Sequence, residues 1–282
     1  MIGVLLASIG TLFEEVSTSF GKWEMTRKVE SPFTFGFLQL FWGGVILLGI
    51  ALFRSGSFVF SLASLPTFLS RVVIEIIQAH VTVVAISVAS RSTFGFIRIL
   101  TVPLLLGVDM ALGLVPTPFQ VVGIALAVVT LVMLFRNHGI ERTGAWLTLF
   151  TAVNAVTTLS LYQYDVRHFN SVVAEQLLVH AVLIAYFAIV AWTSTHEHPF
   201  RLLLRRATFA QSVAMGVGGI IGSFAVLFAP ISITLAASRS SSVLWSVVGG
   251  RLTFHEGRLA LKVTAVALLA TALVFLAVPH LW

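Results

Sequence analysis

Cysteine is absent from this 282-residue sequence, and charged residues are scarce. The lack of cysteine excludes disulfides, iron–sulfur clusters and thiol chemistry, but it does not identify a compartment. Only 10% of the residues are charged, whereas soluble domains carry about 25%. In contrast, 58% are hydrophobic, and the mean hydropathy is +1.01. A chain this apolar cannot cover itself with polar surface, so we expect the lipid bilayer to be its solvent.

The sequence motifs of soluble enzymes are also missing. The sequence has no H-E-x-x-H, no G-x-S-x-G and no phosphate-binding loop. The stretch "HEH", with His196 and His198, is weak evidence for a metal because only two loop histidines contribute. We therefore predict no metal, no cofactor and no enzymatic activity, and we keep a membrane-embedded enzyme as an alternative.

Basic residues outnumber acidic ones, which gives a formal net charge of +6. In a soluble protein this excess would suggest nucleic acid as a partner. Here the arginines lie between long apolar runs, where such residues set the orientation of a membrane protein. We therefore predict no nucleic-acid binding.

Long apolar runs dominate the chain. A membrane-spanning helix needs about 20 mostly apolar residues, and the alternating pattern of a transmembrane barrel is absent. The sequence predicts an all-α membrane protein with ten transmembrane helices, in the cell (plasma or inner) membrane. The first run lacks the basic start and cleavage site of a signal peptide, so it is predicted to be a retained span. The ten predicted spans are roughly residues 2–22, 33–53, 68–89, 93–114, 118–135, 143–163, 171–193, 208–228, 231–251 and 260–279.

The two halves of the chain resemble each other. The polar stretch "RNHGIERTG", residues 136–144, has five predicted spans on each side. Arg98 lies inside the fourth span, and Arg239 lies inside the ninth. An odd number of spans per repeat inverts the second repeat in the membrane, which is the plan of many secondary transporters. We therefore predict two inverted five-helix repeats, residues 1–137 and 138–282.

Several segments carry a family resemblance. "GTLFEEVSTSFGK" with "SPFTFGFLQLFWGGVILLGIALF" resembles the first two helices of the EamA-like carriers, a ten-helix branch of the drug/metabolite transporter superfamily. "AISVASRSTFGFIRILTVPLLLGVDMALG" with "PFQVVGIALAVVTLVML" resembles helices three to five, and "SSSVLWSVVGGRLTFHEGRLALKVTAVALLATALVFL" resembles helices nine and ten. Lys22, Pro103 and Glu256 then match the end of helix one, the proline of helix four and a short acidic connector. The chain departs from the family at Leu114 and Val115, where an acidic residue is usual.

Two adjacent acids, Glu14 and Glu15, lie in the first apolar run. An ionisable group at the bilayer centre costs about 2.5–3.5 kcal/mol on insertion scales, so retaining two suggests a use. The small multidrug resistance proteins, which belong to the same superfamily, similarly keep a glutamate shortly before a lysine in helix one. This resemblance implies that Glu14 or Glu15 carries a proton or binds a cation. The alternative is a structural pair with Lys22 or with an arginine of another helix.

Arg98 and Arg239 are the second set of candidates. Arginine stays charged at all relevant pH and bonds carboxylate or phosphate in a forked geometry. The resemblance to plastid sugar-phosphate carriers, which use basic residues on these helices, implies an anionic substrate group. The alternative is that the two arginines neutralise nearby acids. Trp245 follows Arg239 and either stacks on a substrate ring, faces lipid or packs against other helices.

Further polar residues within the apolar runs are predicted to line a central cavity or to bond neighbouring helices. They are Glu75, Gln78, Asn154, Glu175 and His180. Two helix-packing features are also predicted. Pro103 is expected to kink the fourth span, and the G-x-x-x-G pair Gly218 and Gly222 is expected to allow close packing.

The orientation in the membrane stays open. The family places both termini in the cytoplasm, but basic residues concentrate in the odd-numbered connectors, which would put both termini outside. We predict a proton-coupled or exchange-driven secondary transporter of a small metabolite or drug-like solute. A membrane-embedded enzyme and a non-transporting scaffold are the alternatives, and association into a homodimer stays open.

Overall fold

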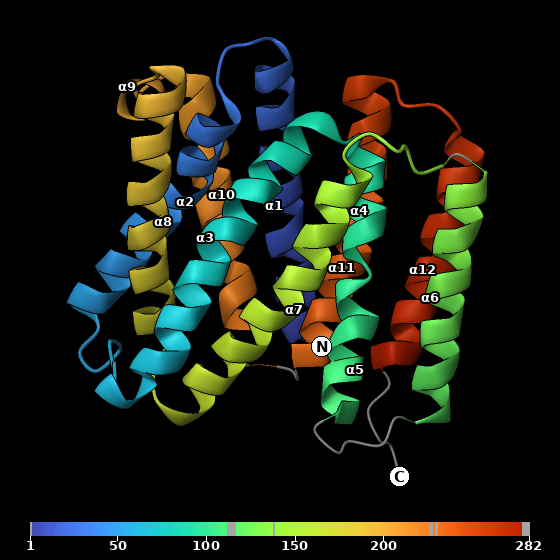
Figure 1. Cartoon of the computed structure of the whole chain (residues 1–282), viewed down its shortest axis with the longest axis horizontal. Helices are drawn as coiled ribbons and strands as arrows, with labels where there is room; N and C mark the ends of the chain where they lie inside the picture. Colours follow the sequence, from blue (N-terminus) through green and yellow to red (C-terminus); the bar gives the residue numbers. More distant parts are fainter. Residues whose placement is uncertain (1, 112–116, 138, 226–227, 229–230, 278–282) are drawn as a thin grey trace.

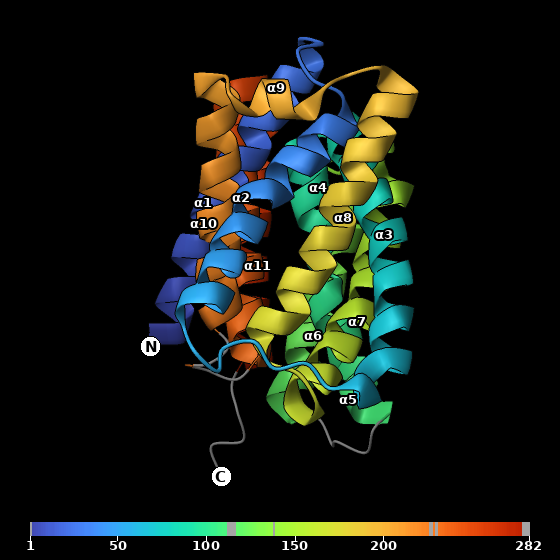
Figure 2. The same cartoon turned by 90° about the vertical axis from the view of Figure 1, so that its left-hand side faces the viewer.

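The computed structural model describes residues 2–111, 117–137, 139–225, 228 and 231–277. Within these residues the secondary structure is entirely helical, and the long helices run side by side as a bundle (Figures 1 and 2). The helices are α1 (Ile2–Thr26), α2 (Pro32–Phe53), η1 (Leu62–Ser64), α3 (Leu65–Val88), α4 (Arg91–Arg98), α5 (Thr101–Ala111), α6 (Pro118–Arg136), α7 (Ala145–His168), α8 (Val172–Thr195), α9 (Pro199–Leu203), α10 (Arg206–Ala225), α11 (Ile231–Phe254) and α12 (Leu259–Ala277).

Five of the described helices are long and apolar enough to cross a bilayer. They are α2, α3 with its preceding turn, α7, α8 and α10, and shorter apolar stretches cover residues 121–136 and 259–272. These lengths and compositions confirm a multi-pass, all-α membrane protein. The sequence predicts more crossings than these five. In particular, the predicted span 93–114 is not one continuous helix, because α4 ends at Arg98 and α5 begins at Thr101.

The break between α4 and α5 follows from Pro103. Proline has no N–H to donate to the carbonyl four residues earlier, and its ring clashes with that carbonyl. The affected carbonyl is that of Ile99, which instead accepts a hydrogen bond from the Val102 N–H at 2.9 Å. The predicted distortion of this helix is confirmed, as an interruption and not only as a kink.

Serine side chains cap the N-termini of α2, α4 and α8. The side chains of Ser31, Ser90 and Ser171 accept hydrogen bonds from the backbone N–H three residues later, at 3.2, 3.3 and 3.2 Å. Such N-caps satisfy donors that have no partner inside the helix, and replacing one with alanine costs about 1 kcal/mol. Short connectors capped in this way fix where α2, α4 and α8 enter the bundle.

Helix contacts define the interior. α1 packs against α10 and α11, α7 packs against α3 and α4, α2 packs against α8, and α6 packs against α12. One apolar cluster forms around Phe96, Leu134 and Leu269, and another forms around Phe35 and Phe187. Many large apolar side chains point outward instead, which suits a bundle surrounded by lipid.

Helices α1 and α10 approach each other closely. A Cβ atom at Gly218 would lie 2.6 Å from the carbonyl oxygen of Gly10, and a Cβ atom at Gly10 would lie 2.7 Å from the carbonyl oxygen of Gly218. Small residues let helix backbones approach this closely in membranes. The predicted close packing at Gly218 and Gly222 is therefore present, with α1 as the partner helix.

We expect Gly218→Ala to destabilise the protein by about 1–3 kcal/mol, because the new methyl group must push two backbones apart. The measurement is the unfolding free energy in detergent, followed by tryptophan fluorescence. Gly49→Ala is the matched control, since a Cβ atom at Gly49 meets no atom within 4 Å. Alanine is favoured over glycine in a helix by about 1 kcal/mol, so the control should not lose stability. Equal stability of the two variants would contradict this account of the crossing.

Candidate functional site

A cavity of about 350 Å³ lies inside the bundle, between α1, α3, α4, α7, α8, α10 and α11. Its lining contains several charged side chains, and burying a charge costs free energy unless the charge is paired. The charged lining residues are Glu14, Glu15, Arg71, Glu75, Arg98 and Arg239, which come from both halves of the chain. The cavity therefore gathers groups that lie far apart in the sequence.

The structure brings together six of the residues that the sequence singles out and leaves four elsewhere. The residues that line the cavity are Glu14, Glu15, Glu75, Gln78, Arg98 and Arg239. Asn154, Glu175, His180 and Trp245 do not line it. Sequence reasoning missed Arg71, although it precedes Glu75 by four residues and so shares its helix face.

Glu15 is tied to its neighbours. Its carboxylate accepts hydrogen bonds from the Arg91 guanidinium and, at 2.6 Å, from the Ser242 hydroxyl. Arg91 is 1% exposed, so the ion pair is buried. Lys22, the other partner considered for the helix-one acids, donates to the carbonyl of Ala89 instead. Glu15 therefore fits the structural-pair alternative, with an arginine as its partner.

Glu14 has a different environment. Its Oε1 faces the glycine surface of α10, where Cβ atoms at Gly219 and Gly222 would lie 3.9 and 3.8 Å away. Within the described residues, no hydrogen bond or ion pair reaches its carboxylate. Of the two adjacent acids, Glu14 is the one whose carboxylate remains available to the cavity.

Arg98 and Arg239 are also not paired. In the part of the chain that the structure describes, neither guanidinium has a carboxylate within 4.0 Å, and each Nε is buried without a hydrogen-bond partner. The Arg98 guanidinium lies 5.2 Å from the ring centre of Phe94. Two of the acids that these arginines were expected to neutralise, Glu15 and Glu75, lie next to Arg91 and Arg71 instead.

Glu175 does not line the cavity, but it forms a buried ion pair with Arg71, which does. The Arg71 Nη1 lies 2.8 Å from its Oε1, and the Asn170 amide donates to its Oε2 at 2.7 Å. The Arg71 Nε is also 4.0 Å from an oxygen of Glu75. Arg71 therefore bridges the fully buried Glu175 and the cavity acid Glu75.

The remaining candidates have local partners. The His180 ring bonds the carbonyl of Gln176 at 2.8 Å, and the Asn154 amide donates to the carbonyl of Ile74 at 3.4 Å. Trp245 lines a second, mostly apolar groove of about 510 Å³ between α1 and α11, together with Trp23, and this groove shares Glu15 with the cavity. All three side chains therefore lie outside the cavity lining.

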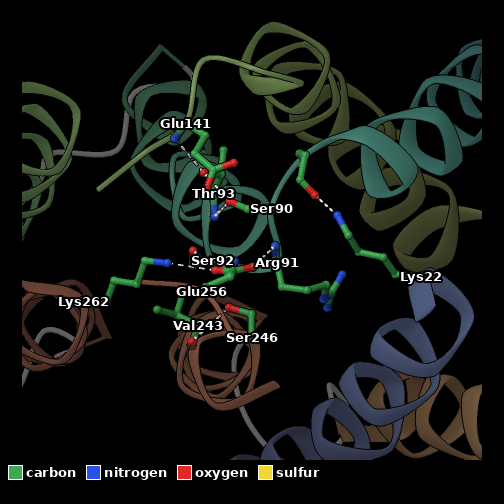
Figure 3. Close-up of polar contacts among 11 residues, drawn as sticks. Lys22, Ser90, Arg91, Ser92, Thr93, Glu141, Val243, Ser246, Glu256 and Lys262 are labelled. Atoms are coloured by element: carbon green, nitrogen blue, oxygen red, sulfur yellow. Dashed lines mark hydrogen bonds and ion pairs between the residues drawn. The ribbon is translucent and has the colours of Figure 1, made fainter. Parts of the chain in front are cut away.

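The end of the bundle where α4 begins carries a dense polar network (Figure 3). Glu256 lies at its centre and contacts the first turn of α4, while Lys262 of α12 lies 2.8 Å from its carboxylate. Burial opposes ionisation of Glu256, but hydrogen bonds from Lys262 and Ser92 outweigh that effect and lower its pKa. Glu256 is therefore a carboxylate at neutral pH.

The described residues hold no group of three or more histidine, cysteine or acidic side chains arranged to bind a metal ion. Comparison with protein-family models gives no match, and comparison with curated proteins gives none. The resemblance to the EamA-like carriers therefore rests on the sequence segments themselves, and positions 114 and 115 lie outside the described residues.

Proposed function

We propose that this protein is a secondary carrier of a small solute, built from ten membrane crossings in two inverted repeats, residues 1–137 and 138–282. The helix contacts support this division. α1 contacts α10 and α11, and the corresponding helix of the second half, α7, contacts α3 and α4. The pairs α2 with α8 and α6 with α12 join corresponding helices across the two halves. A carrier of this plan binds its substrate between the repeats.

The main observation behind the proposal is that charged groups of both halves line the same cavity. Arg98 comes from the first half and Arg239 from the second, and neither has a carboxylate partner among the described residues. Keeping two arginines without carboxylate partners in an apolar bundle costs free energy unless a ligand binds them. An anionic group on the solute, carboxylate or phosphate, supplies the missing acceptor oxygens.

Glu14 gives the same cavity an acidic group. Unlike Glu15, it has no arginine or hydroxyl partner among the described residues. A carboxylate in this position can bind a proton when the solute is absent, or a cationic group of the solute when it is present. Exchange of the proton for the solute then couples transport to a proton gradient, with the two repeats rocking around the cavity.

Glu14→Gln is expected to abolish coupling, because glutamine has the size of a protonated glutamate but cannot release a proton. The test first screens carboxylates and phosphates for stabilisation of the purified protein against heat. The stabilising compound is then followed into proteoliposomes with and without a pH gradient. We expect the gradient-driven accumulation of the solute to fall at least about tenfold in Glu14→Gln. A tenfold change corresponds to about 1.4 kcal/mol.

Glu141→Gln is the matched control, because Glu141 is exposed and its side chain contacts no part of the cavity. This variant should transport like the unmodified chain. Wild-type rate and wild-type pH dependence in Glu14→Gln would remove the proton role from Glu14. Failure of every stabilising compound to enter proteoliposomes of the unmodified protein would overturn transport itself.

A further inference from the structure

Helix α4 begins and α11 ends at the same end of the bundle, at the top of Figure 1. Toward that end, the cavity lining reaches Glu15 on α1 and Ser242 on α11 and goes no further. Beyond these residues, Gly95 of α4 packs so closely on Ser246 of α11 that a Cβ atom at position 95 would collide with the serine hydroxyl. A packed layer of α4 against α11 therefore lies between the cavity and this end of the bundle, beside the apolar groove between α1 and α11 that also reaches Glu15.

Glu256 fastens that layer from the connector between α11 and α12 (Figure 3). Its Oε1 accepts the backbone N–H of Arg91 at 2.7 Å. Its Oε2 accepts the backbone N–H of Ser92 at 3.4 Å and also the Ser92 hydroxyl. These donors belong to the first turn of α4, where a carboxylate is favoured by the free N–H groups and by the helix dipole. Glu256 thus joins α4 to the far end of α11.

Arg91 connects this fastening to the cavity. Its backbone N–H is held by Glu256, while its guanidinium bonds the carboxylate of Glu15, which lines the cavity. One residue therefore contacts both the connector at the closed end and a charged group of the site. Movement of α4 away from Glu256 must also disturb the Arg91–Glu15 pair.

The sequence has no counterpart of Glu256 in the corresponding connector of the first half. If the two halves are repeats, the counterpart of the α11–α12 connector is the connector between α5 and α6. That connector reads "LGLVPT" over residues 112–117 and contains no acidic residue. The sequence of that connector therefore has no counterpart of Glu256, and the buried carboxylates at the other end of the bundle, Asp165 and Glu175, join α7 and α8 to α3 instead.

We propose that Glu256 is a latch that holds the cavity closed at the end where α4 begins, and that Arg91 links this latch to Glu15. The inference rests on the proposed function, since a latch is useful only if the cavity opens to both sides in turn. Release of Glu256 from the first turn of α4 then precedes entry or exit at this end. The latch also makes the state with this end closed the resting state of the carrier.

Thiol labelling tests the latch without a known substrate. Because the chain has no cysteine, Ser238→Cys places a single thiol in the cavity lining. The probe is a membrane-impermeant maleimide, applied to either side of vesicles that contain the protein. We expect labelling of Ser238→Cys from one side only. Adding Glu256→Gln should raise the rate from the other side at least about tenfold, as expected for losing charge-assisted hydrogen bonds.

Glu141→Gln is the control at the same end, because only its backbone N–H, at 2.9 Å from the Thr93 hydroxyl, takes part in the network. It should leave both labelling rates unchanged. If Glu256→Gln does not fold, Ser92→Ala removes one hydrogen bond from the same carboxylate and should raise the rate in the same direction.

The labelling results test the latch and the proposed carrier function separately. Unchanged labelling from the closed side in both the Glu256→Gln and Ser92→Ala variants would overturn the latch and leave the cavity intact. Labelling of Ser238→Cys from both sides at equal rates, without any further change, would also overturn it. Absence of labelling from either side would instead remove the accessible cavity on which the proposed function depends.

Discussion

Arg71→Met is expected to lower the free energy of unfolding by about 3–5 kcal/mol, the cost of leaving a buried charge without its partner. Arg71 is 4% exposed and Glu175 is fully buried, with 2.8 Å between the guanidinium nitrogen and the carboxylate oxygen. After the substitution, Glu175 keeps only the Asn170 amide as a hydrogen-bond donor. A carboxylate in that position must either stay charged in an apolar surrounding or take up a proton.

The double variant Arg71→Met with Glu175→Gln separates charge from packing. Glutamine removes the charge and can still accept the Asn170 hydrogen bond, so most of the lost stability should return. Both variants are measured by denaturant titration in detergent, beside Arg54→Met, which replaces an exposed arginine and should change stability by less than about 0.5 kcal/mol. Similar losses in Arg71→Met and in the double variant would show that the ion pair is not the source of the effect.

The helices of this protein could be predicted from the sequence because hydropathy is a local property. Each predicted span overlaps a helix, and Pro103 marks the interrupted one through the hydrogen bond that it cannot make. The starts of α2, α4 and α8 also follow from local chemistry, since a serine cap needs only its own first turn. These features depend on neighbours within a few residues in the sequence.

The partners of the buried charges could not be predicted in the same way. Arg91 meets Glu15 across 76 positions of sequence, and Arg71 meets Glu175 across 104. Such pairs depend on how each helix is rotated, and hydropathy fixes rotation poorly in a helix that is apolar on most sides. Glu75 and Gln78 are three positions apart and so share a helix face, but no such spacing shows that Glu175 pairs with Arg71 without lining the cavity.

Glu30 is a second buried acid, and it is expected to make the free energy of unfolding depend on pH. Glu30 lies in the connector between α1 and α2, is 3% exposed and accepts one hydrogen bond, from the Gln211 amide at 3.4 Å. Burial raises its pKa to about 8, and the neighbouring carboxylates of Glu24 and Glu197 act in the same direction, while the Gln211 hydrogen bond opposes them. In the unfolded chain the same group has a pKa near 4.5.

The sign of the effect follows from proton binding. Between about pH 4.5 and pH 8 the folded protein keeps a proton on Glu30 that the unfolded chain has released. Folding is therefore favoured by protons in this window, and the stability contributed by Glu30 is full below pH 4.5 and is lost as the pH rises through 8. At about 1.4 kcal/mol for each unit of pKa difference, the total change amounts to several kcal/mol.

Glu30→Gln should remove this dependence, because the amide resembles the protonated acid and does not titrate. Between pH 5 and pH 9 the measured free energy of unfolding should change less favourably with rising pH for the unmodified chain than for Glu30→Gln, so that the variant is the more stable protein at pH 9. Glu141→Gln, which replaces an exposed acid, should follow the unmodified chain across the range. Parallel curves for the unmodified chain and Glu30→Gln would mean that Glu30 releases its proton in the folded state as readily as in the unfolded chain. The connector that packs it against Gln211 would then have to be open to water.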